Sequence, residues 1–200
     1  MMNIQDLEKR IKLPEAAGKA VDQIKITEAE YREQKQIFDR NLEEFIDKWK
    51  HRENKSEWAL KFYLMLSCET YEVYKEKGIA GEIFDRTFYD ITIWCEECYR
   101  KYQIYGLEEI GWIAQSVKMN LFRLGRLQFE PYLLKEDMKC KAGILKRGTE
   151  VLNVHIPAGE PLDHEKCLES FKMAEHFFED DGKRHIYMCD SWLLSPRLKE

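Results

Sequence analysis

The last third of the chain constrains the fold most, because its pattern changes from strand to helix and back to strand. Residues 151–156 have the pattern of a strand, and residues 157–161 form a loop with glycine and proline. Residues 163–179 carry a helical apolar stripe, and residues 185–192 have the pattern of another strand. Two strands joined through a helix are most often parallel neighbours in one sheet. Ligands of such sheets bind beyond the carboxyl ends of the strands, so residues 157–161 are the first candidate site.

Before Leu121, the spacing of apolar residues predicts helices only. Thr27 begins a capping box with Glu30, and apolar residues follow it at helical spacing. Ser56 is the next candidate for a helix N-cap. The main expected helices cover residues 27–49, 56–78, 81–102 and 107–120.

At Leu121 the pattern changes, and from Gly125 onward the apolar period is two residues, which is typical of a half-buried strand. Residues 121–130 are expected to form one strand, with Arg126, Gln128 and Glu130 on the same face. A buried charge needs a partner, so Arg126 and Glu130 are expected to pair with each other or with a ligand. Residues 142–145 and 151–156 flank a glycine-containing segment and predict a hairpin.

The element order predicts an α+β protein with segregated parts. Residues 1–120 form a helical N-terminal domain, and residues 121–200 form a mixed sheet with β-β-β-α-β order. A further helix is expected to start at Ser195, and the sequence ends within it, so the sheet is expected to be incomplete at the C-terminus.

The composition narrows the class of protein. A net charge of -5 disfavours a general nucleic-acid binder. The apolar runs are far shorter than the ~20 residues that cross a bilayer, so no membrane partner is expected. The N-terminal residues are polar and lack the apolar region of a signal peptide, which predicts a cytoplasmic protein.

Cys95 and Cys98 form a CxxC pattern within a helix, with no second such pair, so no metal is expected.

His155 is the most interesting polar residue of the candidate sheet. A parallel neighbour strand brings it near Cys189 or Ser191, or near Asp190 and Trp192, depending on the register. Two interpretations stay open: a hydrogen-bonded histidine of the sheet, or one half of a Cys-His nucleophilic pair.

Three blocks of sequence, residues 121–130, 151–159 and 191–196, resemble a family of bacterial GNAT-like acyltransferases. That family joins a helical N-acyltransferase N-terminal domain to a GNAT-like C-terminal domain. The resemblance extends from the helix near residue 83 to the end of the chain, and it implies acyl-CoA as co-substrate.

The resemblance also implies where acyl-CoA binds. Its thioester arm would pair with the backbone near Val154 and Ile156, and its pyrophosphate would lie on Ala158, Gly159 and the first turn of the helix. The loop has a single glycine, Pro161 removes one amide donor, and Glu160, Asp163 and Glu165 add negative charge where phosphate is expected.

The first functional hypothesis is therefore an acyl-CoA-dependent acyltransferase that acts on an amine or a similar small nucleophile. His155, or Glu130 through a water molecule, would be the base. Tyr187 or Cys189 would protonate the departing thiolate. The alternative is a non-catalytic GNAT-like binding module that has lost CoA binding, which the acidic loop favours. A third hypothesis is a thiol hydrolase built on Cys189 and His155.

Overall fold

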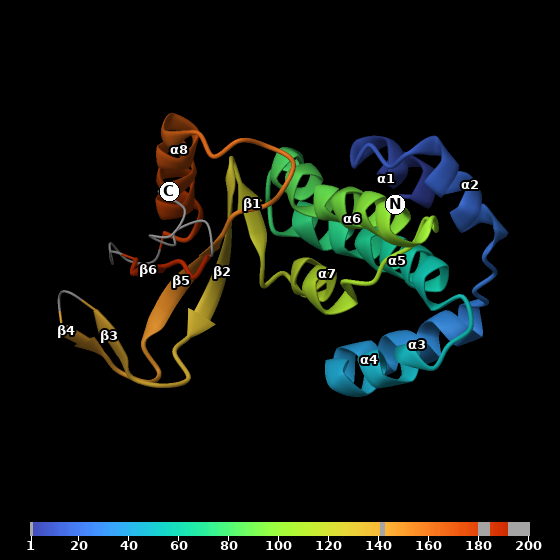
Figure 1. The fold of residues 1–200 in the computed structure, drawn as a ribbon, viewed down its shortest axis with the longest axis horizontal. Helices are drawn as coiled ribbons and strands as arrows, with labels where there is room; N and C mark the ends of the chain where they lie inside the picture. The colour runs from blue at the N-terminus through green and yellow to red at the C-terminus, as the bar shows by residue number, and fades with distance from the viewer. Residues whose placement is uncertain (1, 141–142, 180–184, 192–200) are drawn as a thin grey trace. The chain divides into compact units, whose positions relative to one another are not determined.

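The computed structural model describes residues 2–140, 143–179 and 185–191 (Figure 1). The chain divides into two compact units, residues 1–119 and residues 120–200. In the described residues the first unit is helical, and every strand lies in the second unit. The predicted α+β class is confirmed, with the first strand starting at Phe122.

The helices of the first unit surround one long central helix. Within the described residues they are α1 (Ile4–Arg10), α2 (Glu15–Gln23), α3 (Glu28–Arg40), α4 (Leu42–Lys50), α5 (Lys55–Glu76), α6 (Gly81–Tyr102) and α7 (Ile110–Val117). Helix α5 packs against α1, α2, α4, α6 and α7, so side chains are buried on several of its faces. The predicted bounds of α6 are confirmed.

The helix expected over residues 27–49 is in fact two helices, α3 and α4. Thr27 caps α3 as predicted, because its side chain accepts a hydrogen bond from the amide of Glu30. Asn41 leaves helical geometry with φ −153° and caps α4 through the amide of Glu44. Apolar residues continue at helical spacing across Asn41, which is why the pattern predicted one helix.

Ser56 is not the N-cap of α5, so that prediction is wrong. Asn54 occupies the cap position in left-handed geometry. The Ser56 hydroxyl is buried and donates to the Glu108 carboxylate, so the residue joins the start of α5 to the segment before α7.

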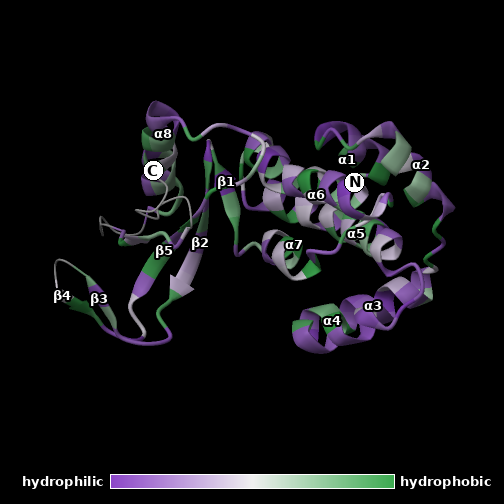
Figure 2. Cartoon of the chain, viewed as in Figure 1, coloured by the Kyte–Doolittle hydropathy of each residue, from purple (hydrophilic) through white to green (hydrophobic). Residues whose placement is uncertain are grey.

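An aromatic cluster joins α3, α4 and α5. Phe62 is fully buried, with its ring centroid 4.7 Å from that of Trp58 and 5.2 Å from that of Phe45, both in stacked geometry. Phe38 meets Phe45 edge-on at 5.4 Å. In Figure 2 the ribbon of α3 is mostly purple, because most of its residues are hydrophilic, and only three of its side chains are buried.

In its described residues, the second unit contains two sheets and one helix. Its elements are β1 (Phe122–Leu124), β2 (Leu127–Leu133), β3 (Met138–Cys140), β4 (Gly143–Leu145), β5 (Glu150–His155), α8 (His164–Phe177) and β6 (Tyr187–Met188). The larger sheet has the order β1-β2-β5-β6, while β3 and β4 pair with each other.

The strand expected over residues 121–130 is a hairpin of β1 and β2, so that prediction is wrong. The strands are antiparallel, with Leu124 opposite Leu127, and Gly125 and Arg126 form the turn. Gly125 has φ +70°, and a Cβ atom there would lie 2.8 Å from Ser170 Oγ. Glycine at the first position of a two-residue turn is the hairpin signal that the alternation concealed.

The hairpin expected from residues 142–145 and 151–156 is also wrong, because the described strands in these segments, β4 and β5, do not pair with each other. Strand β4 pairs with β3, and β5 pairs with β2 instead, with Phe129 opposite Val154. Strand β2 continues past Pro131, because its pairing with β1 ends at Phe129 and proline is tolerated at a strand edge.

The parallel pairing of the strands on either side of α8 is confirmed. Leu152 of β5 lies opposite Tyr187 of β6, and Asn153 lies opposite Met188. Asp163 caps α8 as predicted, accepting from the Lys166 amide at 2.9 Å. Strand β6 is shorter than expected. Two other expectations, residue 192 of that strand and the helix from residue 195, lie outside the described residues.

Candidate active site

Polar side chains occupy one face of the larger sheet. The register places Arg123 of β1 opposite Gln128 of β2, and Gln128 opposite His155 of β5. Glu130 and Asn153 form the next cross-strand pair on the same face, because residues two apart in a strand share a face. The strand pairing therefore brings together Glu130 and His155, both of which the sequence had singled out.

The side chains of Glu130 and His155 are hydrogen-bonded to each other. The His155 Nε2 atom lies 2.9 Å from Glu130 Oε2, and Asn153 Nδ2 donates to the same oxygen at 3.1 Å. The hydrogen bond from His155 lowers the pKa of Glu130, and that from Asn153 adds to it, while burial acts in the opposite direction. Glu130 is therefore a carboxylate near neutral pH, and His155 donates to it from Nε2. Both side chains are about three-quarters buried, with 24% exposure for His155 and 22% for Glu130.

Tyr187 lies on the opposite face of the sheet. It pairs with Leu152, and its ring packs 4.9 Å from that of Phe171 on α8. Its hydroxyl donates to Glu175 Oε1 at 2.6 Å. Burial, and then this bond to a carboxylate, raise the pKa of Tyr187. The structure thus does not bring Tyr187 together with His155.

Cys189 follows the end of β6 and is half-buried. Burial, and then the nearby Asp190 carboxylate, raise the pKa of its thiol, which disfavours the thiolate form. In the observed register Asn153 lies opposite Met188. If this register continued, Asp190 would lie opposite His155, because each residue is two positions further along its strand. Cys189 would then lie on the other face of the sheet from His155.

The backbone from Val154 to Gly159 carries the residues expected to hold the cofactor. Val154 lies near the end of β5, and Ile156 follows its last residue. Among the described residues, the pairing of β5 with β6 ends at Asn153, which lies opposite Met188. No acceptor in the described part of the chain bonds the amides of Ala158 or Gly159.

Arg126 holds the loop between β5 and α8 in shape. Its guanidinium donates from Nη1 to the Pro157 carbonyl at 2.9 Å, from Nη2 to the Glu160 carbonyl at 2.6 Å and from Nε to the Pro161 carbonyl at 2.9 Å. Its own amide donates to Ser170 Oγ of α8 at 2.7 Å. The side chain is buried and its partners are these carbonyls, so the expected Arg126–Glu130 pair is wrong. The turn geometry points Arg126 at the loop instead.

Arg123 is a site residue that no sequence pattern marked. Its Nη2 atom donates to Glu160 Oε1 at 2.8 Å, with side-chain exposures of 2% for Arg123 and 42% for Glu160. The negative charge of Glu160, which the sequence suggested would oppose phosphate binding, is therefore paired with Arg123. Only the register of the β1–β2 hairpin reveals that Arg123 and the loop are neighbours.

Cys95 and Cys98 are buried in α6, and burial raises the pKa of Cys95 to about 12. No group of three or more His, Cys, Asp or Glu side chains in the described ranges could hold a metal ion. Of the helices that the structure describes, none combines the length and apolar character of a membrane span.

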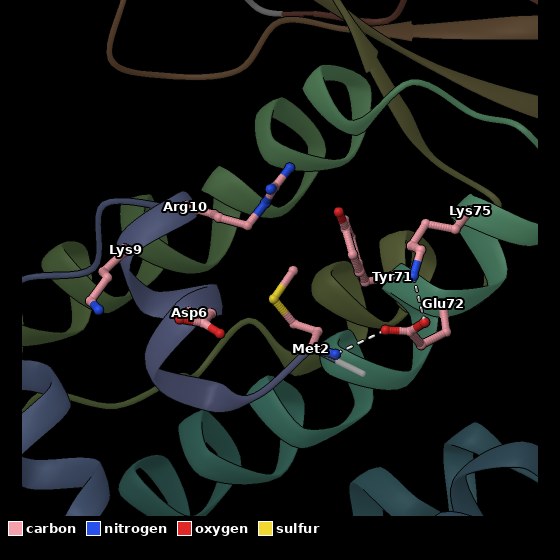
Figure 3. A pocket seen from close by; sticks show the side chains of 7 residues that line it. All are labelled: Met2, Asp6, Lys9, Arg10, Tyr71, Glu72 and Lys75. Atoms are coloured by element: carbon pink, nitrogen blue, oxygen red, sulfur yellow. Dashed lines mark hydrogen bonds and ion pairs between the residues drawn. The ribbon is translucent and has the colours of Figure 1, made fainter.

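The helical unit has an open surface pocket of about 490 Å³ beside α1 and α5 (Figure 3). Arg10 makes two contacts with Asp85, at 2.7 and 3.0 Å. Glu72 accepts from Lys75 at 3.0 Å and from the Met2 amide at 2.8 Å. The Arg10–Asp85 pair ties α1 to α6, and the Met2 amide ties the segment before α1 to α5, so these contacts have a structural role.

The second unit is GNAT-like in its element order, with a parallel β5–α8–β6 unit beside antiparallel strands. Residues 2–119 match the N-acyltransferase N-terminal domain, and residues 121–200 match the GNAT-like C-terminal domain. The chain belongs to this N-acyltransferase family. No curated protein matches the chain.

The fold is similar to that of solved acyltransferases. One is an acyltransferase in complex with decanoyl-CoA and teicoplanin, with 21% identity and a TM-score of 0.74 over 98% of this chain. Another is an acyltransferase in complex with CoA and 10C-teicoplanin, with 20% identity and a TM-score of 0.74 over 100% of this chain. This chain covers 63% of the first structure and 64% of the second.

Proposed function

We propose that this protein is an acyl-CoA-dependent acyltransferase that transfers an acyl group to an amine or a similar small nucleophile. The observation that carries the proposal is the Glu130–His155 pair, with its 2.9 Å hydrogen bond at the end of β5. A histidine oriented by a carboxylate is a suitable general base. Membership in the N-acyltransferase family supports the same reaction class.

In the proposed mechanism, neutral His155 removes a proton from the acceptor amine as its nitrogen attacks the thioester carbonyl carbon. The Glu130 carboxylate stabilises the imidazolium that forms. An amide near Ile156 donates to the carbonyl oxygen as negative charge develops there. The carbon–sulfur bond then breaks, and the imidazolium returns its proton to the CoA thiolate. His155 replaces Tyr187 as the acid, because the Tyr187 hydroxyl is bonded to Glu175 on the other face.

The proposed donor site is the β5–α8 loop. Arg126 binds the carbonyls of Pro157, Glu160 and Pro161, and the amides of Ala158 and Gly159 have no acceptor within the described residues. Loop amides and the first turn of α8 suit the pyrophosphate of CoA. The solved acyltransferases contain decanoyl-CoA or CoA, so a decanoyl donor is a reasonable first substrate.

The acceptor is proposed to be a small molecule with an amine, by analogy with the teicoplanin complexes. A cytoplasmic location is part of the proposal, because acyl-CoA is a cytoplasmic metabolite and all six cysteines are free. A bacterial source is also part of it, and rests on the resemblance.

The non-catalytic alternative depended on the acidic loop. Glu160 is paired with Arg123 at 2.8 Å, so its charge no longer argues against a bound phosphate. Asp163 accepts from the Lys166 amide at 2.9 Å, so its carboxylate caps α8.

The test is a comparison of wild-type protein with His155→Gln, which keeps hydrogen bonding but removes basicity near pH 7. Decanoyl-CoA affinity is measured by calorimetry, and thioester cleavage with an amine acceptor is followed by thiol release. We expect kcat to fall roughly 100-fold or more, with donor affinity and Tm nearly unchanged. His176→Gln, at a histidine whose side chain is 91% exposed, is the matched control.

Two results would contradict the proposal. A wild-type protein that binds no CoA ester would remove the donor site. A His155→Gln variant that is fully active but less stable would show a structural histidine and direct attention to Glu130.

A further inference from the structure

The Arg123–Glu160 ion pair lies at the place where the proposed function requires an anion of the ligand. We propose that Glu160 occupies the phosphate position of the donor site and that a CoA phosphate displaces it from Arg123. Glu160 then acts as a built-in competitor for phosphate-bearing donors. This inference rests on the proposed donor site.

The burial of the two partners is unequal. The Arg123 side chain is 2% exposed, so its charge requires a nearby anion at all times. The Glu160 side chain is 42% exposed. Glu160 is therefore the partner that can leave, while Arg123 stays in place.

Displacement of Glu160 does not require the loop to move. Its backbone carbonyl accepts a hydrogen bond from Arg126 Nη2 at 2.6 Å, and the carbonyls of Pro157 and Pro161 bind the same guanidinium. The backbone is anchored by Arg126, and the side chain is bonded to Arg123. Rotation of the Glu160 side chain would therefore release Arg123 Nη2 from Glu160 Oε1 while the backbone of the loop stays in place.

Phosphate is a chemically suitable replacement. A guanidinium binds the oxygens of a carboxylate and of a phosphate in the same planar geometry. The amides of Ala158 and Gly159 are additional donors that a phosphate reaches and that the Glu160 carboxylate leaves unused among the described contacts. The nearby Asp163 is already bonded to the Lys166 amide at 2.9 Å, so it caps α8 and does not compete.

The test compares Glu160→Gln with Glu169→Gln in the full chain, by calorimetry with acetyl-CoA and with acetyl-pantetheine, which has no phosphate. The Glu160→Gln side chain keeps an oxygen for Arg123 but has no charge. Glu169 is an exposed residue of α8 beyond its first turn and makes no ion pair within the described part of the chain, so its variant controls for the general loss of one negative charge. Glu160→Ala is a second variant, and Tm verifies folding.

We expect Glu160→Gln to bind acetyl-CoA about fivefold to tenfold more tightly than wild type. Acetyl-pantetheine affinity should not change, and Glu169→Gln should tighten acetyl-CoA binding by about twofold at most. Equal or weaker binding by Glu160→Gln and Glu160→Ala, while wild type binds, would overturn the inference and make Glu160 a loop-ordering residue. Equal tightening by Glu169→Gln would also overturn it. Absence of acetyl-CoA binding by wild type and both Glu160 variants would instead defeat the donor site itself.

Discussion

Replacement of Arg126 with Met tests how the candidate donor loop is held. The side chain is buried, with the residue 4% exposed, and donates three hydrogen bonds of 2.6–2.9 Å to loop carbonyls. A hydrogen bond from a charged donor contributes about 1.5–3 kcal/mol. Removal of a buried cation also relieves several kcal/mol of desolvation, which offsets part of the loss. We expect a net loss of about 2–4 kcal/mol in the local stability of the loop and α8.

Hydrogen exchange measured by mass spectrometry is the suitable assay, because it reports on each segment of a two-unit chain. A loss of about 2 kcal/mol makes exchange roughly 30-fold faster in peptides from α8. Acetyl-CoA affinity should fall at least about tenfold, since the loop loses its shape. Arg147→Met makes the same chemical change at an exposed turn residue and should alter exchange very little.

One clear result would refute this account of the loop. If Arg126→Met leaves the exchange of α8 and the affinity for acetyl-CoA unchanged, the three carbonyl bonds do not determine the loop conformation. The loop would then be held by the Pro157 and Pro161 backbone alone.

Two further predictions concern the turn of the β1–β2 hairpin and the cysteine after β6. Gly125→Ala should destabilise the second unit by about 2–3 kcal/mol in urea unfolding, because φ is +70° and the new Cβ would lie 2.8 Å from Ser170 Oγ. That oxygen accepts hydrogen bonds from the amides of Arg126 and Leu127. A neutral effect would show that the turn relaxes. Cys189 should react with iodoacetamide near neutral pH more slowly than the exposed Cys140, because burial and Asp190 raise its pKa and reduce its thiolate fraction, as peptide mapping would measure. Faster labelling of Cys189 would support the thiol hydrolase.

The sequence alone determined the parts of the fold that depend on local signals. The period of apolar residues separated helices from strands, and the side chains of Thr27 and Asp163 marked two helix starts that the structure confirms. The pattern on either side of α8 also predicted the parallel pairing of β5 with β6. These signals act within a few residues, so they can be read without knowing the partners.

Only the tertiary structure decided which strands pair and which polar groups meet. The turn at Gly125 split an expected single strand, and β2 paired with β5 across a long insertion. That register placed Glu130 beside His155, and the turn directed Arg126 to loop carbonyls instead of Glu130. A shift of one residue would have moved every side chain to the other face of the sheet. Such contacts join residues far apart in the sequence, and no local pattern specifies them.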